Sequence, residues 1–363
     1  MKKILLLGIC TSIIVCSLAQ PGTGELNEFY KPQENPILRA DSTLKFFDPI
    51  KKEWVRWQRA DVFNPGAIVR DGKIFLLYRC EDNPAAAIGG RTSRLGLAES
   101  NDGIHFKKFP SPVLYPDNDA FSMYDYPGGC EDPRLVEAED GHYVVVYTSW
   151  NNKTPRLSVA ISKDLFHWEK MGPAFAKAYN GKFLNIDSKS GSIITRMVKN
   201  KLIAAKIKGR YWMYWGEHFI NLAWSENLLD WNPLLNEQGE LKQIVLTRPG
   251  KFDSDLTECG PPAVMTNKGI ILLYNGKNAM GKNADPGLPK GTYSVGQVIF
   301  DKADPEKPIG RSENCFLKPT LPHEKTGQYQ AGTTFSEGLV FYKGKWFLYY
   351  GTADSFVGVA VSK

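Results

Sequence analysis

The chain has 363 residues, with 45 Lys and Arg against 39 Asp and Glu and a formal net charge of +6 at pH 7. This mild excess is spread along the chain and forms no basic stripe, so nucleic acid is not expected as a partner. No spacing of Cys or His indicates a metal site, and we expect neither a metal nor an organic cofactor.

The first 19 residues have the features of a secretory signal. Lys2 and Lys3 precede an apolar run that ends at Val15, and Ser17-Leu18-Ala19 supplies a small-x-small cleavage site. The run is short for a membrane span, and no other long apolar run follows. We therefore expect an exported, periplasmic chain without a membrane span. Attachment to the cell surface as a lipoprotein through Cys16 is the alternative.

After residue 60 one unit recurs five times: an apolar strand, a Gly-containing turn and a second apolar strand ending in Tyr. The units cover residues 66–78, 135–147, 193–214, 262–274 and 339–350. The pattern Ser-x-Asp/Asn-x-x-x-aromatic follows the first three units, beginning at residues 100, 162 and 225. Pro and Gly interrupt apolar runs that are rich in aromatic and β-branched residues, which is typical of an all-β chain.

A period of 60–70 residues suits four-stranded blades with long loops better than the common forty-residue repeat. We therefore predict an all-β fold, a five-bladed β-propeller formed by residues 61–363. Residues 20–60 are an N-terminal segment, of which a part, 45–60, is expected to complete the last blade. A pair of β-sandwiches is the alternative fold.

The ends of the hairpins are where we expect the functional site. In an antiparallel hairpin the start of the first strand and the end of the second are neighbours opposite the turn, so these ends meet at one mouth of a propeller. The polar residues there are Asn64, Arg79, Glu131, Asp132, Arg134, Asp187, Lys189, Glu217, Glu258, Asn275 and Asp354, with Tyr274 at a strand end and Arg94 near the same rim. Carboxylates, amides and arginines in an aromatic-rich funnel are suited to binding the hydroxyls of a sugar.

Structural roles compete with this interpretation for some of these residues. Arg79 and Arg134 can pair with neighbouring carboxylates inside the channel, and Lys189 can cap a loop. Asp132 has no capping role at a strand start. Glu217 and Glu258 emerge from apolar surroundings, which tend to raise a carboxyl pKa.

Six short motifs lie at these strand ends: Asn64-Pro65-Gly66-Ala67, Tyr78-Arg79, Ser93-Arg94-Leu95-Gly96, Glu131-Asp132-Pro133-Arg134, Gly260-Pro261-Pro262 and Tyr350-Gly351-Thr352-Ala353-Asp354. Together they resemble glycoside hydrolase family 130, five-bladed propellers acting on β-mannosides, over about residues 60–363. The resemblance implies that Asp132 is the catalytic acid, which protonates the glycosidic oxygen through a hydroxyl of the bound mannose. It also implies a −1 subsite formed by Asn64, Arg79, Arg94, Arg134 and Asp354. We expect Lys189, Tyr274 and Asn275 to contact substrate as well.

The chain departs from the pattern of the phosphorylases that dominate this family. They have a His-Arg pair after the third unit and Tyr-His-Gly after the fourth, where this chain has Trp215-Gly216-Glu217 and Tyr274-Asn275-Gly276. Carboxylates at such positions would repel phosphate by about a kcal/mol or more per charge at an intermediate dielectric. A carboxylate can instead activate water as a general base.

We therefore predict an inverting hydrolase of β-linked manno-oligosaccharides, similar to the β-1,2-mannosidase branch, with Glu217 and Glu258 activating the water. Three alternatives remain open: a phosphorylase, a five-bladed glycosidase of another family, and a non-catalytic glycan-binding propeller. The sequence leaves the oligomeric state open.

Overall fold

The computed structural model describes residues 26, 28–86 and 90–363. The predicted signal segment 1–19, with its cleavage site and Cys16, lies outside the described residues. Strands make up nearly all of the regular secondary structure of the described residues, so the predicted all-β fold is confirmed. Three single-turn helices interrupt the strands: α1 (Ser122–Asp125), η1 (Ala178–Gly181) and η2 (Pro322–Glu324).

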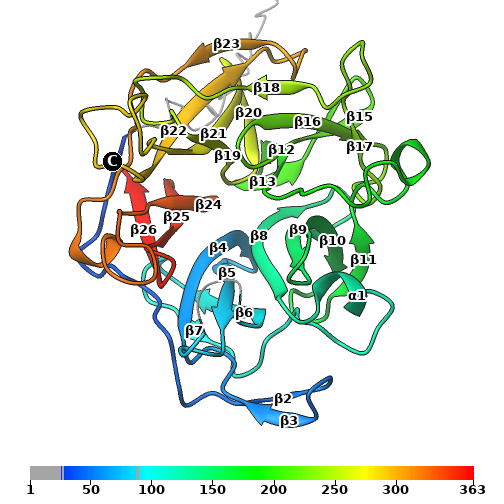
Figure 1. Ribbon diagram of the computed structural model, residues 1–363, viewed down its shortest axis with the longest axis vertical. Helices are drawn as coiled ribbons and strands as arrows, with labels where there is room; N and C mark the ends of the chain where they lie inside the picture. Colours follow the sequence, from blue (N-terminus) through cyan, green and yellow to red (C-terminus); the bar gives the residue numbers. More distant parts are fainter. Residues whose placement is uncertain (1–25, 27, 87–89) are drawn as a thin grey trace, which may run out of the picture.

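Apart from the hairpin of β2 (Phe46–Asp48) and β3 (Glu53–Val55), the strands fall into five antiparallel groups, named here blades 1 to 5, which surround a common centre (Figure 1). Blade 1 contains β4 (Asp61–Arg70), β5 (Lys73–Glu81), β6 (Ser93–Ser100) and β7 (Lys107–Lys108). Blade 2 contains β8 (Gly129–Glu137), β9 (Tyr143–Trp150), β10 (Pro155–Ser162) and β11 (Glu169–Pro173). Blade 3 contains β12 (Gly191–Val198), β13 (Lys201–Ala204), β14 (Lys206–Ile207), β15 (Arg210–Trp215), β16 (Ile220–Ser225), β17 (Asn232–Pro233) and β18 (Gln243–Val245).

Blade 4 contains β19 (Leu256–Cys259), β20 (Ala263–Thr266), β21 (Gly269–Lys277), β22 (Tyr293–Phe300) and β23 (Pro308–Arg311). Blade 5 contains β24 (Phe335–Tyr342), β25 (Lys345–Thr352) and β26 (Phe356–Ser362), with β1 (Phe29–Tyr30) as its outer strand. Short parallel pairings join inner strands of neighbouring blades, such as Ile194 with Ala263 between blades 3 and 4.

The hydrophobic core is divided into five buried clusters, and each cluster draws most of its side chains from two neighbouring blades. Leu77 and Val145 share the cluster between blades 1 and 2, for example, and the other four clusters lie between blades 2 and 3, 3 and 4, 4 and 5, and 5 and 1. A two-layer sandwich would have one core between two sheets. A closed ring of five inter-blade cores is instead consistent with the five-bladed propeller predicted from the sequence.

The strand that completes blade 5 comes from a different place than predicted. Phe29 and Tyr30 pair with Ser362 and Val361 of β26. Residues 45–60, which were expected to do this, form the separate hairpin of β2 (Phe46–Asp48) and β3 (Glu53–Val55), drawn below blade 1 in Figure 1. This hairpin is held beside blade 1 by an ion pair between Asp48 and Arg94, so its position depends on a buried charge that the strand pattern does not reveal.

The repeated Ser-x-Asp/Asn motif forms a turn. Ser100 Oγ accepts a hydrogen bond from the backbone N–H of Gly103 at 2.8 Å, and Asp102 Oδ1 accepts one from that of His105 at 2.8 Å. The same bonds recur from Ser162 and Ser225. These are side-chain-to-backbone bonds that stabilise turns, so the motif serves the fold.

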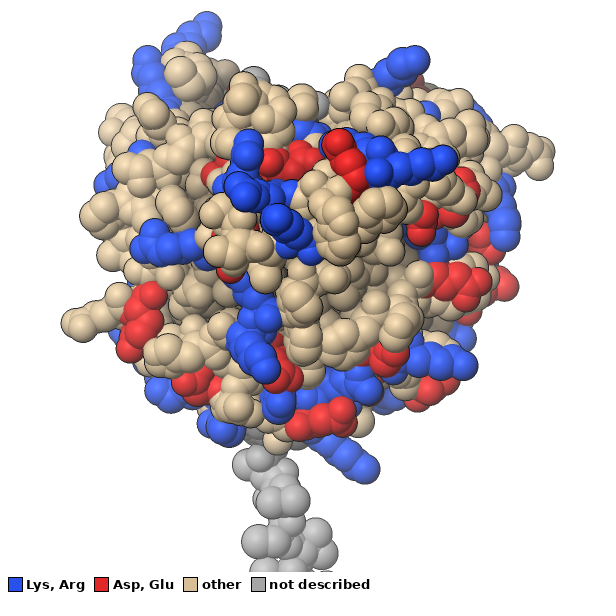
Figure 2. Space-filling view, turned by 90° about the horizontal axis from the view of Figure 1, so that it is seen from below, with Lys and Arg blue, Asp and Glu red and all other residues tan. Residues whose placement is uncertain are grey.

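Charged side chains are mixed on the surface. On the face shown in Figure 2, Lys and Arg side chains are interspersed with Asp and Glu. In the part of the chain that the structure describes, no helix has the length and apolarity needed to cross a membrane.

Candidate active site

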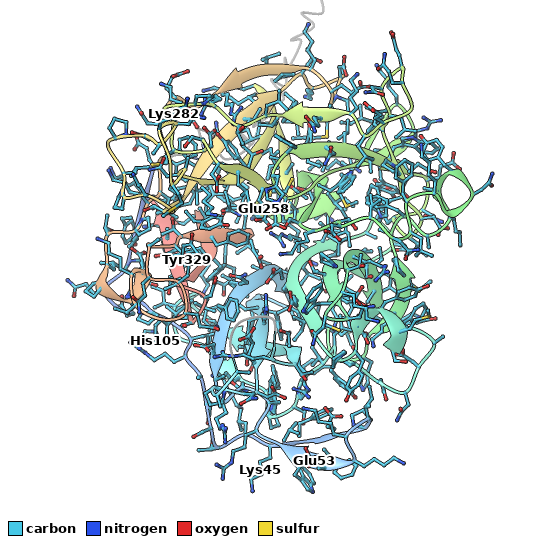
Figure 3. All side chains as sticks on the ribbon, viewed as in Figure 1. Lys45, Glu53, His105, Glu258, Lys282 and Tyr329 are labelled. Carbon is cyan, nitrogen blue, oxygen red and sulfur yellow. The ribbon has the colours of Figure 1, made fainter. Side chains whose placement is uncertain are left out.

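A cavity of about 460 Å³ opens where the five blades converge, and every blade contributes to its wall. Its lining residues are Phe63, Asn64, Arg79, Glu131, Asp132, Trp150, Lys153, Pro155, Asp187, Lys189, Glu217, Glu258, Tyr293, Tyr329, Thr333, Phe335 and Asp354. Figure 3 shows Glu258 near the centre of the ring and Tyr329 on a loop beside it, whereas His105 lies at the periphery. The cavity therefore lies where the hairpin ends were predicted to meet.

Two β-bulges aim side chains at the cavity from blades 1 and 2. The pairing of β4 with β5 shifts register between Phe63 and Pro65, around Asn64. The pairing of β8 with β9 shifts between Glu131 and Arg134, around Asp132. A bulge bends its strand and redirects a side chain, and bulges are frequent next to active sites.

Three cavity residues also have left-handed backbones. The φ angles of Asn64, Asp132 and Asp354 are 49°, 49° and 51°. Positive φ is uncommon for residues other than glycine and concentrates at functional sites, where the surrounding structure holds it in place. The backbone therefore supports a functional role for all three.

Arg79 gathers three carboxylates on one side of the cavity. Its Nη1 lies 3.2 Å from Asp132 Oδ1, and its Nη2 lies 2.8 Å from both Glu131 Oε1 and Glu81 Oε1. Burial raises the pKa of Glu131 to about 7, against the opposing charge of Arg79. Burial acts on Asp132 too, but Arg79 and Lys189 outweigh it and hold the pKa of Asp132 below its usual value.

Glu258 and Glu217 enter the cavity from blades 4 and 3. Glu258 is buried in β19 and accepts a hydrogen bond from Ser190 Oγ. Burial, together with the nearby charge of Glu217, raises the pKa of Glu258 to about 7. Glu217 follows β15 and is half-buried, and its Oε2 lies 3.7 Å from Lys189 Nζ.

Lys189 lies between the two sides of the site. Burial alone would lower the pKa of this ammonium group, but Glu217, Glu258 and Asp132 outweigh it and raise the pKa above its ordinary value. Asp354, at the end of blade 5, has a pKa raised to about 6 by burial. The cavity thus combines carboxyl groups with different proton affinities, which is typical of a site for acid–base chemistry.

Four of the predicted substrate-binding residues do not line the cavity: Arg94, Arg134, Tyr274 and Asn275. Arg94 is fully buried and pairs with Asp48 and Asp82, because β6 presents it to the N-terminal hairpin and not to the mouth. The predicted sugar contact for Arg94 is therefore wrong.

Tyr274 and Asn275 point to opposite sides of β21, as strand alternation requires. The hydroxyl of Tyr274 donates to Asp253 at 2.6 Å, on the side away from the cavity. Both atoms of the Asn275 amide group are bonded to Ser336 of the neighbouring blade. The predicted substrate contacts of these two residues are wrong, because each polar group already has a partner inside the protein.

Arg134 lies beneath the cavity. It is 1% exposed and pairs with Glu337 at 3.1 Å, and its other donors point to backbone carbonyls. The sequence raised pairing inside the channel as one alternative for this arginine, and the structure shows such a pairing, although with Glu337 and not with the carboxylate of Asp132.

Several cavity residues were missed by the hairpin-end rule. Trp150 is the last residue of β9, so a strict reading of that rule would have found it. Tyr293 is the first residue of β22 in blade 4, a strand that does not belong to the inner hairpin. Tyr329 and Thr333 lie in the long connection between blades 4 and 5. No periodic signal marks such a loop. Among the residues that the structure describes, no group of His, Cys, Asp and Glu is placed to hold a metal ion.

The chain matches one protein family over almost its whole length. The sequence profile of glycoside hydrolase family 130, described as β-1,4-mannooligosaccharide phosphorylase, matches residues 30–363. A characterised relative is the 1,2-β-oligomannan phosphorylase of Thermoanaerobacter sp. (strain X514), 31% identical over 309 residues, which cover 84% of this chain and 90% of that protein.

Solved structures with higher identity are available. A putative glycosidase from Bacteroides thetaiotaomicron VPI-5482 is 54% identical, with a TM-score of 0.91 over 92% of this chain and 96% of the other. A second solved structure is 50% identical, with a TM-score of 0.91 over 92% of this chain and 93% of the other. Its description states that the family of mannoside phosphorylases contains glycoside hydrolases that target β-1,2-mannosidic linkages in Candida mannan. The chain belongs to glycoside hydrolase family 130.

Proposed function

We propose that the protein hydrolyses β-mannosidic linkages, of the β-1,2 type, with inversion at the anomeric carbon. One observation carries this proposal: Glu217 and Glu258 line the same cavity as Asp132. An acid and a carboxylate base in one sugar-sized cavity are the two groups that an inverting glycosidase requires.

The charges of the cavity disfavour phosphate as the nucleophile. Among the described lining residues, six are carboxylates and three are cations. Arg79 is already paired with three carboxylates, and Lys189 lies next to Glu217. Lys153 is exposed. A phosphate dianion near Glu217 and Glu258 would be repelled, whereas a neutral water molecule would not.

The relatives also support hydrolysis of β-mannosides. The solved structure described as targeting β-1,2-mannosidic linkages by hydrolysis is 50% identical to this chain. The oligomannan phosphorylase is 31% identical. Both descriptions concern β-mannosides, so the substrate class rests on both, and the choice of nucleophile rests on the carboxylates.

The proposed reaction is a single displacement. Water attacks the anomeric carbon while the bond from that carbon to the leaving oxygen breaks. Glu258 accepts a proton from the water, and Glu217 orients the water from the other side. Asp132 supplies the proton that the leaving oxygen requires, through a hydroxyl of the bound mannose, and proton exchange with solvent then restores both groups.

The acid must hold a proton when the substrate is bound. In the open cavity Arg79 and Lys189 hold the pKa of Asp132 down. A sugar that fills the cavity displaces water from Asp132, and loss of solvation raises a carboxyl pKa. Glu131, with its pKa of about 7, keeps a proton on this side of the site near neutral pH.

The experiment is incubation with β-1,2-mannobiose in phosphate-free buffer, followed by proton NMR. We expect free mannose, with the α anomer appearing first, and no increase in rate when phosphate is added. Release of mannose 1-phosphate that depends on added phosphate would overturn hydrolysis. Appearance of the β anomer first would overturn inversion, and binding without turnover would indicate a glycan-binding protein.

A further inference from the structure

A third β-bulge lies at the centre of the ring and carries a carboxyl group that the reaction above does not use. The pairing of β24 with β25 shifts register between Ser336 and Gly338, around Glu337. Glu337 therefore occupies in blade 5 the position that Asn64 occupies in blade 1 and Asp132 in blade 2. Two of these three bulges present a cavity residue, so the third is a candidate for a role in the same site.

Glu337 does not reach the cavity itself. It is 0% exposed, and its Oε1 forms an ion pair with Arg134 Nη1 at 3.1 Å. Neither carboxyl oxygen meets the geometry of a hydrogen bond with any described residue. A buried polar group whose hydrogen-bonding capacity is so little used is costly, and in a native structure it calls for an explanation.

Arg134 connects Glu337 to both sides of the proposed reaction. Its Nη1 donates to the carbonyl of Asp132 at 2.9 Å, and its Nη2 donates to the carbonyl of Cys259 at 3.0 Å. Asp132 is the proposed acid, and Cys259 directly follows the proposed base, Glu258. One guanidinium group thus spans the backbone of the acid and the backbone next to the base, and it approaches the Gly260 carbonyl as well.

The inner strands leave little room for movement around this pair. A Cβ on Gly338 would lie 2.7 Å from the carbonyl oxygen of Pro65, and a Cβ on Gly66 would lie 2.7 Å from that of Pro133. The three bulges therefore pack backbone against backbone. A shift at Glu337 would be transmitted to the neighbouring bulges, because closely packed interiors transmit strain.

We propose that Glu337 is a positioning residue for catalysis, which acts through Arg134 to fix the backbone of Asp132 relative to that of Glu258. This proposal rests on the acid and base roles assigned above. It does not depend on the nucleophile, because a phosphorylase would also need Asp132 held in place.

Burial and the neighbouring charged groups shift the pKa of Glu337. Burial raises its pKa well above the usual value, the nearby Asp132 and Glu258 add to this, and Arg134 and Arg79 oppose it. These groups come from blades 1, 2 and 4, and Glu337 itself from blade 5. An amide of the same shape offers Arg134 the same acceptor oxygen without a charge, so it should replace the carboxyl group.

The experiment compares Glu337→Met, which keeps the length but removes both oxygens, with Glu337→Gln. The matched control is Glu324→Met. Glu324 is also 0% exposed, its carboxylate lies 2.6 Å from the ammonium group of Lys31, and neither residue lines the cavity. Mannoside cleavage is measured with whichever nucleophile the unaltered protein uses, together with pH–rate profiles and melting temperatures.

We expect Glu337→Met to lower kcat by about 10²-fold, the effect of misplacing a catalytic group by about 1 Å, with KM changed much less and the pH–rate profile displaced. Glu337→Gln should keep most of the activity. Glu324→Met should lower the melting temperature but leave kcat unchanged.

The proposal is overturned if Glu337→Met keeps normal kcat, if its defect lies in KM alone, or if Glu324→Met loses kcat to the same extent. Inactivity of the Gln variant would overturn the role of the acceptor oxygen. If Glu337→Met does not fold, Glu337→Asp, which withdraws the carboxyl from Arg134, serves instead, and normal kcat there would be equally decisive. Dependence on phosphate in the unaltered protein would refute hydrolysis without affecting these comparisons.

Discussion

The side-chain amide of Asn64 donates a hydrogen bond of 2.8 Å to Oδ1 of Asp132, and this bond joins the bulge of blade 1 to the bulge of blade 2. Arg79 binds the same oxygen at 3.2 Å. The proposed acid is therefore held by one neutral and one cationic donor, both from blade 1. Because the Asn64 amide is neutral, its removal tests how much the orientation of the Asp132 carboxylate contributes, without removing the positive charge of Arg79.

Replacement of Asn64 by Ala is expected to lower kcat by about tenfold or more, because hydrogen bonds to charged groups contribute about 1.5–3 kcal/mol and each 1.4 kcal/mol corresponds to a factor of ten in rate. The pKa of Asp132 should rise, since Asn64 helps to hold it down. The measurements are kcat and the pH dependence of kcat/KM. Asn118→Ala is the control, because Asn118 is exposed and bonds to Pro49 far from the cavity. Equal activity of the two variants would contradict the role of Asn64.

Gly351 tests the same bond without touching either partner. A Cβ at this position would lie 1.9 Å from Asn64 Oδ1, so Gly351→Ala must displace the Asn64 side chain. We expect a loss of kcat similar to that of Asn64→Ala, and a double variant whose loss is far less than the sum of the two, as for residues that act together. Gly310→Ala is the control, since its nearest contact would be an ordinary 4.0 Å. Additive losses would show that Gly351 acts by another route.

The assignment of the base is tested by Glu258→Ala and Glu217→Ala. Glu258→Ala should lower hydrolysis by about 10²–10⁴-fold, the usual range for loss of a general base. Glu217→Ala should also lower it, because the water loses the group that orients it from the other side. Azide is a nucleophile that needs no base, so it should restore turnover of the Glu258 variant and yield α-mannosyl azide, the inverted product. Glu313→Ala is the control, because Glu313 lies exposed beside Lys251. Near-normal hydrolysis by both single variants would exclude these residues as the base.

The pH dependence of kcat, which reports the groups in the substrate complex, should rise as pH increases through the Glu258 pKa of about 7, because the proposed base works only when it is ionised. Lys189, Arg134 and Glu217 face Glu258 and modulate this limb. At higher pH the rate should fall where the proposed acid, Asp132, loses its proton in the substrate complex. A profile that is flat across neutral pH would contradict the assignment of Glu258 as the base.

The sequence brought Asp132, Glu217 and Glu258 to one mouth because those residues lie at hairpin ends, and the antiparallel pairing of each blade places those ends together around one cavity. It failed for Tyr274 and Asn275 because a strand end does not reveal which face a side chain occupies. Arg94 was misplaced because its partner Asp48 comes from the N-terminal hairpin, a contact made across distant parts of the chain.

The role of the bulges could not be derived from strand periodicity. A bulge inserts one residue and changes which side chains face the centre, as at Asp132 and Glu337. Tyr329 was missed because the connection between blades 4 and 5 is irregular and is placed by contacts with distant parts of the chain, such as the ring of Tyr293 and the carbonyl of Gly291. Closure by Phe29 and Tyr30 was missed because so short a strand carries no alternation.

That closure leads to the last prediction, on stability. Lys31 follows β1, and its ammonium group lies 2.6 Å from the fully buried Glu324 and donates to the carbonyl of Lys318 at 2.8 Å. Lys31→Met leaves Glu324 without its cation, and breaking a buried ion pair in this way costs about 3–5 kcal/mol. Urea unfolding should show a loss of this size, while kcat under native conditions stays unchanged because the pair lies outside the cavity. Lys177→Met, which breaks the exposed pair with Asp230, should cost at most about 1 kcal/mol. Similar losses for the two variants would mean that the β1 segment does not hold blade 5 in the folded ring.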